Sequence, residues 1–343
     1  MGEVTRRAVL AWPVAAAAKF RTTGAPRHQP GIVSLPPNAT VLAALDLRGA
    51  GLDVVTRLFA MLDRGIRALG GQVETTVSVG ASLFDARFGL ATARPPELVP
   101  MPAFRNDLLD PAQCHGDLLL QVGADLPGTA QRALRSLLTP DIRLRWRITG
   151  FRAGNGTDAH GRPTSRNLFG FSEGAGNPEG DDRLWVRPVG AGDAWAAGGT
   201  YLVVRTIRLA LARWNYDPVS RQELIIGRRK SDGAPLGRTP LDAHVRRADP
   251  GTAGPPGGGI LRRGYSFRRG LDPTGQPDEG HLFICYQNSI ERGFAAVQRR
   301  LAGEPLERYV LPVGGGYFFV LPAADRLGQP LLDAGRSGAD ARP

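Results

Sequence analysis

Cysteine and histidine are scarce in this sequence, which limits the disulfide and metal sites it can form. The only thiols are Cys114 and Cys285, and the five histidines form neither an HxxxH nor an HxH pattern. Two thiols so far apart do not make a disulfide framework or, by spacing, a metal site, so we expect buried, inert cysteines. The histidine spacing argues against a zinc site with several imidazole ligands.

Lysine is almost absent. Only Lys19 and Lys230 occur among the 43 basic residues, the others being arginines, and the formal net charge is +11. A nucleic-acid-binding protein can carry such a charge, because cations neutralise phosphates. The chain has no dense basic run with interleaved aromatic residues, however. We therefore predict scattered, solvated arginines and no nucleic-acid partner.

Long apolar runs are also lacking. No stretch reaches the roughly 18 residues that span a bilayer, so we expect no stable membrane anchor. Near the start, Thr5–Leu10 reads TRRAVL, a twin-arginine pattern followed by a short apolar segment. Such signals direct folded proteins out of the bacterial cytoplasm. We interpret residues 1–27 as a signal for the twin-arginine export machinery, which would place the protein in the periplasm or outside the cell, or else as a disordered tail.

The composition, with 42% hydrophobic and 22% charged residues, is that of a globular protein. The sequence also contains two pairs of similar segments. Gly116–Leu137 and Gly280–Leu301 each combine a short apolar run, a polar break and a stretch with helical apolar spacing. Ala39–Leu47 and Thr200–Leu209 read as strands that lead toward a helix, the first of which is Val54–Leu69. These pairs predict two similar α+β units, with antiparallel sheets covered by helices on one face.

Composition also suggests the domain boundaries. We place an N-terminal unit at 28–150, a linker at 151–165, a C-terminal unit at 166–332 and a tail at 333–343, after a short helix. The linker overlaps Gly150–Pro163, which is rich in Gly, Thr and Asp, as loops are. A second glycine-rich stretch, Asp249–Gly259, is expected to cross a surface or line a site.

One familiar catalytic motif occurs. Gly170–Gly174 reads GFSEG and fits G-x-S-x-G, the nucleophile elbow of serine hydrolases, which requires a helix directly after the serine. Here AGNPEG follows, which is typical of a turn. A hydrolase with Ser172 as nucleophile is therefore disfavoured.

Three other residues are weak candidates when taken singly. Glu173 is bracketed by Gly174 and Gly176, and such glycines let a backbone approach a flat ligand closely. His244 lies within a short helix predicted over Asp242–Pro250, and a single imidazole can be an axial haem ligand because the porphyrin supplies four nitrogens. Arg262 follows the second glycine-rich loop. Taken alone, each fits a surface residue better than a functional one.

The order of these residues, together with longer motifs, resembles the dye-decolourising (DyP-type) peroxidase family, in particular its twin-arginine-exported, deferrochelatase-like branch. The resemblance extends from His28 to Leu332. The motifs that carry it are HQPGI at His28–Ile32, SLFDARFGL at Ser82–Leu90, RNLFGFSEGAGNP at Arg166–Pro178, HVRRADP at His244–Pro250, LRRGY at Leu261–Tyr265, YQ at Tyr286 and Gln287, and GGGYFFVLP at Gly314–Pro322.

The resemblance implies two ferredoxin-like units of the dimeric α+β barrel type, with one haem b per chain held mainly by the C-terminal unit. His244 would be the proximal iron ligand. Glu173 stands where the family has its distal aspartate, and Arg262 would be the distal arginine over the haem. The remaining haem contacts that the resemblance implies are Gly174, Ala175, Gly176, Asp249, Pro250, Gly251 and, at a propionate, Arg205.

The activity that the resemblance implies is oxidation of dyes or other bulky one-electron donors by hydrogen peroxide. Glu173 would move a proton between the two peroxide oxygens, and Arg262 would stabilise the charge that develops as they separate. The partners would be peroxide and a reducing substrate, and a homo-oligomer is compatible with the sequence. The alternative is a deferrochelatase-like haem- or iron-handling protein of the same fold with weak peroxidase activity.

Two positions depart from the family pattern. Glu173 adds one CH₂ to the usual aspartate, and because a misplacement of about 1 Å can cost about 10²-fold in rate, peroxide activation could be slower or shifted in pH. Gln287–Ile290 reads QNSI where the family has Arg-Asp, with the aspartate often near the proximal histidine. Unless another acid replaces it, His244 has a weaker acceptor, and the sequence does not identify one.

Overall fold

The structure is a computed structural model that describes residues 28–157, 163–174, 176–177, 183–188, 190–248 and 259–340. Nine strands form one sheet in the order β7-β11-β2-β3-β1-β4-β9-β10-β8, and every pairing within it is antiparallel. Strand β10 also pairs with β7. The sheet therefore closes into a barrel, with β8 attached beside β10.

The first half of the chain follows the order β-α-β-β-α-β, and its strands lie side by side as β4-β1-β3-β2. Its elements are β1 (Ala39–Leu47), α1 (Leu52–Ala68), β2 (Glu74–Gly80), β3 (Leu118–Ala124), α2 (Pro127–Leu137) and β4 (Ile142–Phe151).

The second half repeats this plan, with its strands ordered β11-β7-β10-β9. The predicted repeat is confirmed, since β3 leads into α2 as β10 leads into α6. A π-helical turn over Glu291–Ala295 opens α6. The elements are β7 (Thr200–Leu209), α3 (Leu211–Tyr216), α4 (Val219–Ile226), α5 (His244–Ala248), β8 (Leu261–Arg262), β9 (Tyr265–Leu271), β10 (Pro277–Gln287), α6 (Ala296–Leu301) and β11 (Val310–Val320).

Alternate residues of the strands enter two separate apolar cores. On β1, Val41 and Ala43 share a core with helix residues such as Leu58 of α1. Leu42 and Ala44 belong to a second core that contains no residue of α1 or α2, and it therefore lies inside the barrel. Because both faces of the strands are buried, they read as continuous apolar runs in the sequence. Helices cover one face as expected, and the other face closes on itself.

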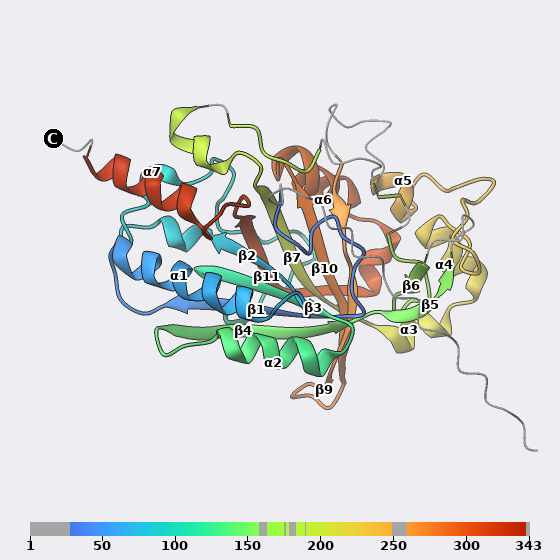
Figure 1. Cartoon of the computed structure of the whole chain (residues 1–343). Coiled ribbons are helices and arrows are strands. Elements are labelled where there is room, and N and C mark those ends of the chain that lie inside the picture. The colour runs from blue at the N-terminus through green and yellow to red at the C-terminus, as the bar shows by residue number, and fades with distance from the viewer. Residues whose placement is uncertain are drawn as a thin grey trace, which may run out of the picture.

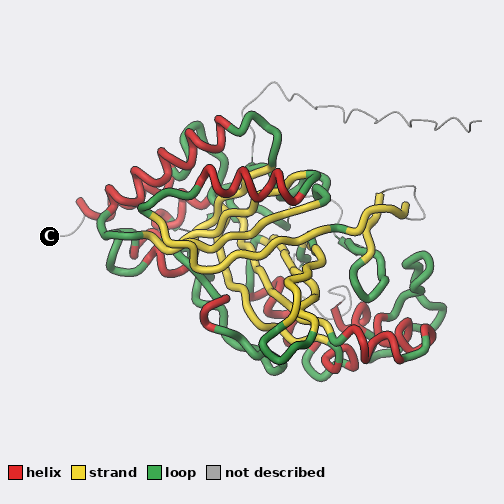
Figure 2. The backbone as a smooth tube through the Cα atoms, turned by 90° about the horizontal axis from the view of Figure 1, so that it is seen from below, coloured by secondary structure: helices red, strands yellow, loops and turns green. Residues whose placement is uncertain are grey.

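The helices lie outside the curled sheet, as Figure 2 shows. Helices α3, α4 and α5 gather at one end of the molecule, away from α7 (Gln329–Asp340) (Figure 1). None of the helices within the described ranges is long and apolar enough to cross a bilayer. The arrangement leaves α5, with His244 at its start, close to α6 and the end of α4.

Two predicted boundaries need correction. The linker predicted at 151–165 contains a small two-stranded sheet, β5 (Ala153–Thr157) with β6 (Pro163–Arg166), because the two segments pair with each other. The tail predicted from 333 is instead the second half of α7. A Cβ added at Gly335 would lie 2.6 Å from Leu90 Cδ2 and 3.3 Å from Leu52 Cδ1. This close packing against the preceding elements extends the helix beyond a short turn.

Several predictions fall outside the described residues. They are the export signal within residues 1–27 and the haem contacts Ala175, Asp249, Pro250 and Gly251. Both thiols, by contrast, are described: Cys114 and Cys285 are free and buried, as expected. Burial raises the pKa of both, that of Cys285 to about 12, so neither is a ready nucleophile.

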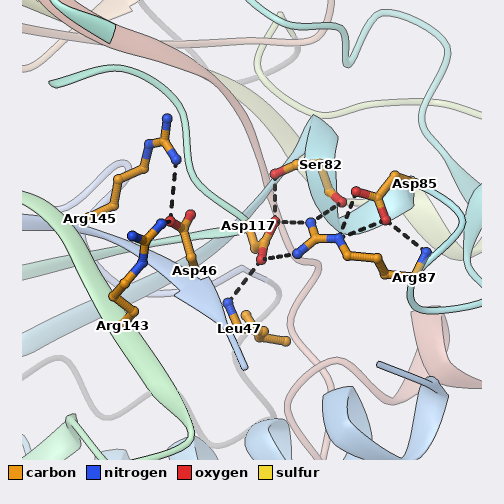
Figure 3. A network of polar contacts seen from close by, with 8 residues as sticks. All are labelled: Asp46, Leu47, Ser82, Asp85, Arg87, Asp117, Arg143 and Arg145. Carbon is orange, nitrogen blue, oxygen red and sulfur yellow. Dashed lines mark hydrogen bonds and ion pairs between the residues drawn. The ribbon is translucent and has the colours of Figure 1, made fainter. Parts of the chain in front are cut away.

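The motif Ser82–Leu90 has a structural role in the first half. Asp117, at the start of β3, accepts hydrogen bonds from Ser82 Oγ at 2.6 Å, the Leu47 backbone N–H at 2.9 Å and Arg87 Nη2 at 2.7 Å, and these groups converge on it in Figure 3. Its side chain is 2% exposed. The buried carboxylate is therefore fully satisfied and ties the ends of β1 and β3 to the turn after β2.

Candidate functional site

His244 is held by a buried carboxylate. Its Nδ1 lies 2.9 Å and 3.0 Å from the two carboxylate oxygens of Glu304, a residue that is 5% exposed at its side chain. Because a carboxylate accepts and does not donate, Nδ1 carries the proton, and the lone pair of a neutral ring then resides on Nε2. A histidine that donates one ring N–H to a carboxylate is the usual arrangement of a metal ligand.

Helix α5 is too short to hold this position alone, and α6 with the turn after it provides the support. Arg247 Nη1 donates to the Ala302 carbonyl oxygen at 2.9 Å, and Arg300 Nε donates to the Arg247 carbonyl oxygen at 2.9 Å. The same turn continues into Glu304. The contact with α6 and the turn after it therefore both orients the His244 ring and holds α5 in place.

The end of α4 connects α5 to the loop that carries Glu173. Gly227, with φ +91, ends α4, and a Cβ at this position would lie 2.6 Å from Val245 Cγ2. The next residue, Arg228, extends back to the loop, where its Nη2 lies 3.5 Å from the position that a Cβ on Gly176 would take. The imidazole helix and the glutamate loop thus lie against the same short segment.

A side-chain amide joins the glutamate loop to β8. Asn177 Oδ1 accepts the Arg262 backbone N–H at 3.1 Å, and Asn177 Nδ2 donates to the Arg262 carbonyl oxygen at 2.8 Å. Glu173 is fixed at the start of the loop, where its N–H donates to the Ser165 carbonyl oxygen at 2.8 Å. A Cβ on Gly176 would lie 3.8 Å from Arg262 Nη2. The structure therefore places the loop that carries Glu173 against Arg262.

In the site, the Glu173 carboxylate interacts with two buried arginines, Arg262 and Arg152. Burial lowers the pKa of Arg262 and that of Arg152, and the Glu173 carboxylate opposes the decrease in both. Arg228 lowers the pKa of Arg262 further. A guanidinium remains charged even so. The site therefore offers fixed positive charge beside a carboxylate that can exchange a proton.

Arg205 lies deeper, on β7, and is 2% exposed. It pairs with Asp107, and its guanidinium carbon lies 5.2 Å from the centre of the Phe104 ring and 5.9 Å from that of Phe294. Its Nε and Nη1 are buried and make no hydrogen bond with the described residues. Asp107 thus satisfies only part of this guanidinium, and contact with a propionate remains a prediction.

The residues present fit a haem better than a bare metal ion. Among the described residues, no three His, Cys, Asp or Glu side chains gather to hold a metal, whereas a haem iron needs only an axial ligand from the protein. Gly174 and Gly176 adopt φ +76 and +80, a left-handed conformation that costs a glycine little and leaves its backbone uncovered. The unpaired N–H groups of Arg205 suit an anionic substituent.

The serine hydrolase interpretation has no structural support. Ser172 forms an isolated bridge with Arg166, and a turn follows over Glu173 and Gly174. The strand–serine–helix geometry of a nucleophile elbow is therefore not formed at this motif.

The two halves of the sequence match the N-terminal and C-terminal domains of one protein family. Residues 29–152 match the family described as Dyp-type peroxidase, N-terminal, and residues 164–325 match Dyp-type peroxidase, C-terminal. The chain belongs to the DyP-type peroxidase family.

Named relatives and solved structures agree with this assignment. The chain is 40% identical to the deferrochelatase of Shigella flexneri over 364 residues, which cover 89% of this chain and 86% of the relative. Ferric DtpA from Streptomyces lividans is similar with a TM-score of 0.85 and 33% identity, covering 94% of this chain and 100% of that chain. A DyP-type peroxidase from Cellulomonas bogoriensis gives 0.82 and 32%, covering 90% and 97%.

This DyP-type peroxidase is therefore a haem enzyme whose reactants are hydrogen peroxide and a reducing substrate.

Three residues of the site were not predicted from the sequence. Glu304 carries no local signal. Asn177 lay within a motif that we used, but its link to Arg262 is a tertiary contact. His281, whose Nδ1 lies 3.7 Å from Glu173 Oε1, was visible as a titratable residue in the apolar segment GHLFICY.

Proposed function

We propose that this DyP-type peroxidase binds one haem b through Nε2 of His244 and uses Glu173 and Arg262 to activate hydrogen peroxide for the oxidation of dyes or other bulky one-electron donors. The observation that carries the proposal is the bond between His244 Nδ1 and Glu304. It fixes the tautomer and the ring orientation, and it leaves Nε2 with the lone pair that a metal ligand needs.

The bound haem would supply an iron that accepts oxidising equivalents from peroxide and passes them on one electron at a time. Glu173 takes the proton from one peroxide oxygen and returns it to the other, which leaves as water. Arg262 stays charged and stabilises the negative charge that develops between the separating oxygens. Glu304 raises the basicity of His244 through the Nδ1 hydrogen bond.

The haem would lie in the C-terminal of two ferredoxin-like units. The element order β-α-β-β-α-β in the first half, and the same strand order in the second, support this description. The further contacts would be Gly174, Gly176 and, at a propionate, Arg205. Ala175, Asp249, Pro250 and Gly251 complete the proposed set.

Replacement of Arg262 by alanine tests the proposal. The variant should retain haem, because the proximal side is untouched, while kcat/KM for peroxide should fall by about 10²-fold or more, the usual cost of removing a charge-stabilising group. Arg268→Ala is the control, because Arg268 is 61% exposed and pairs with Glu279 at the surface. Undiminished turnover in Arg262→Ala would contradict the assignment.

A second candidate function is the handling of haem iron with weak peroxidase activity. The observation that favours it is the 40% identity to proteins named deferrochelatase. The two functions are separated by incubating the holoprotein with a reductant and following porphyrin fluorescence, since a porphyrin fluoresces once it has lost iron. Rising fluorescence with slow dye oxidation favours iron handling. A stable haem spectrum with fast oxidation favours the peroxidase.

We also propose export by the twin-arginine route to the periplasm or outside the cell. The support is the pair Arg6 and Arg7 followed by a short apolar segment. Replacing both arginines by lysine in a full-length fusion should retain the protein in the cytoplasm. Unchanged export of that variant would contradict this route.

A further inference from the structure

His281 is a second titratable side chain beside Glu173, and the proposed function gives it no role. It lies on β10 with its Nδ1 3.7 Å from Glu173 Oε1, and the two side chains are 18% and 12% exposed. The Nδ1 atom is buried and makes no hydrogen bond with the described residues. A buried ring nitrogen without a partner costs free energy unless a nearby group compensates it.

Gly264 provides the space in which the two side chains meet. A Cβ at this position would lie 2.6 Å from Glu173 Oε2 and would collide with Cε1 of His281. The imidazole and the carboxylate therefore converge over a single glycine, two residues after Arg262. Any other residue at position 264 would push them apart.

Among the described residues, Glu173 is the acidic side chain that contacts the His281 ring. Across β9 and β7 the residues opposite His281 are Ser266 and Ile207, and neither titrates in the working range. Two guanidinium groups also lie near the pair. Arg152, which donates to the Gly264 carbonyl oxygen at 2.9 Å, and Arg262 both interact electrostatically with Glu173.

A purely packing role explains the site less well. The His281 ring lies 6.4 Å from that of Phe283, so an apolar side chain would fill the same space without burying a ring nitrogen. The separation of 3.7 Å is longer than a hydrogen bond. Catalytic hydrogen bonds are often long in structures without substrate, however, and shorten when the reactants bind.

We propose that His281 positions the Glu173 carboxylate and shares one proton with it, so that the glutamate–imidazole pair handles the proton of peroxide. The proton removed from one peroxide oxygen resides on the pair and returns to the other oxygen, so no proton is gained or lost. This inference rests on the proposed role of Glu173. It assigns His281 as a positioning residue, since it acts through the carboxylate.

The pair should act as one titrating unit. A protonated His281 favours the ionised form of its neighbour, because an opposite charge stabilises a carboxylate. Replacing His281 by a neutral side chain removes this charge from beside the carboxylate. The acid limb of the profile of kcat/KM for peroxide should therefore move to higher pH, by about one unit.

The test compares His281→Leu and His281→Gln holoenzymes with the unaltered enzyme. His281→Gln keeps a donor of similar size, so it serves if the leucine variant loses haem. The control is His115→Asn, because His115 lies far from the pair in the sequence, before β3, and its φ of 58 suits asparagine. We expect the acid limb to move in both His281 variants and to stay in place in the control.

An equilibrium measurement gives a readout that does not need turnover. Fluoride binds ferric haem proteins with uptake of a proton that a nearby base must hold, so the pH dependence of its dissociation constant should shift in the same direction. In a Glu173→Gln background, His281→Leu should change neither profile, because the two substitutions act on one pair.

The outcomes separate the two proposals. Unshifted kinetic and fluoride profiles in both His281 variants would overturn the role of His281 and leave Glu173 and Arg262 as proposed. Full turnover in the Glu173→Gln enzyme would overturn the proposed function itself. A shift that persists undiminished in the Glu173→Gln background would show that His281 acts through some other group, which also contradicts the inference.

Discussion

The two ring nitrogens of His244 differ in what they can do, and a single neighbour causes the difference. Glu304, from a buried position, accepts a hydrogen bond from the Nδ1–H group at 2.9 Å, so Nε2 is the nitrogen that can bind iron. A carboxylate acceptor also gives the ring partial imidazolate character, which stabilises the higher oxidation state of a bound metal.

Replacing Glu304 by glutamine should therefore raise the reduction potential of the haem, because a neutral amide accepts the Nδ1 hydrogen bond more weakly. Peroxidase activity or metal affinity should fall by about 10- to 100-fold, the usual cost of losing such a partner. Spectroelectrochemical titration measures the potential. Glu291→Gln, at a position 65% exposed, is the control. An unchanged potential in Glu304→Gln would mean that the hydrogen bond does not form in the holoenzyme.

The resemblance in motif order led to the prediction that Glu173 and Arg262 act at one site. It could not predict Glu304, which lies 60 residues from His244 and reaches it only when α5 docks on the turn after α6. At Gln287–Ile290 the sequence lacks the aspartate that the family pattern places near the proximal histidine. Which acid replaces it depends on tertiary packing, which no local pattern encodes.

At the scale of elements, the site depends on how the Glu173 loop is fixed to β8. Both Asn177 hydrogen bonds go to the backbone of Arg262. They therefore fix the strand itself, whichever rotamer the arginine side chain adopts. The loop that carries Glu173 and the backbone of β8 are therefore held in a fixed register.

Asn177→Ala should remove this link and leave haem bound. A misplacement of about 1 Å between catalytic groups can cost about 10²-fold in rate, so kcat/KM for peroxide should fall by up to that factor. Steady-state kinetics at matched haem content provides the measurement. Gln131→Ala removes a comparable partly buried amide contact, to Thr149 on β4, and should not alter turnover. Wild-type kinetics in Asn177→Ala would show that other contacts place Arg262.

Strands were easier to predict than connections. The predicted bounds Ala39–Leu47 and Thr200–Leu209 agree with β1 and β7. Both strands are buried on both faces, so each strand coincides with a continuous apolar run in the sequence. Helix α1 begins two residues before the predicted Val54, after Gly51, which makes no side-chain cap. The β5–β6 hairpin was missed because Ala153–Thr157 reads AGNGT, with low intrinsic strand preference, and becomes a strand only by pairing.

At the scale of the whole molecule, barrel closure joins the two halves into one body. Strand β2 pairs with β11, and β4 pairs with β9, so each half completes the sheet of the other. The internal repeat predicted two units. It could not predict this joining, because the edges that pair are far apart in sequence. A substitution that destabilises the first half should therefore also destabilise the haem site.

Asp117→Asn tests this coupling. The variant keeps the shape of the buried side chain but loses the charge that receives Arg87, Ser82 and the Leu47 N–H. Each hydrogen bond to a charged group contributes about 1.5–3 kcal/mol, so the free energy of unfolding should fall by at least about 2 kcal/mol. Urea unfolding, followed by circular dichroism and by haem absorbance, measures it, and the two signals should change together.

The matched control is Asp85→Asn, which contacts the same arginine from a position 43% exposed and should change stability little. Separate transitions, with haem lost only after the first half has unfolded, would contradict a single cooperative barrel.

Coordination of iron by His244 is tested most directly by the absorption spectrum of the His244→Gly protein, purified with haem supplied and recorded with and without added imidazole. Deleting the ring should leave the protein largely without haem, or with an altered spectrum, and free imidazole should restore the wild-type spectrum by occupying the vacated space beside Glu304. A His244→Gly protein with the wild-type haem spectrum in the absence of imidazole would show that another residue holds the iron.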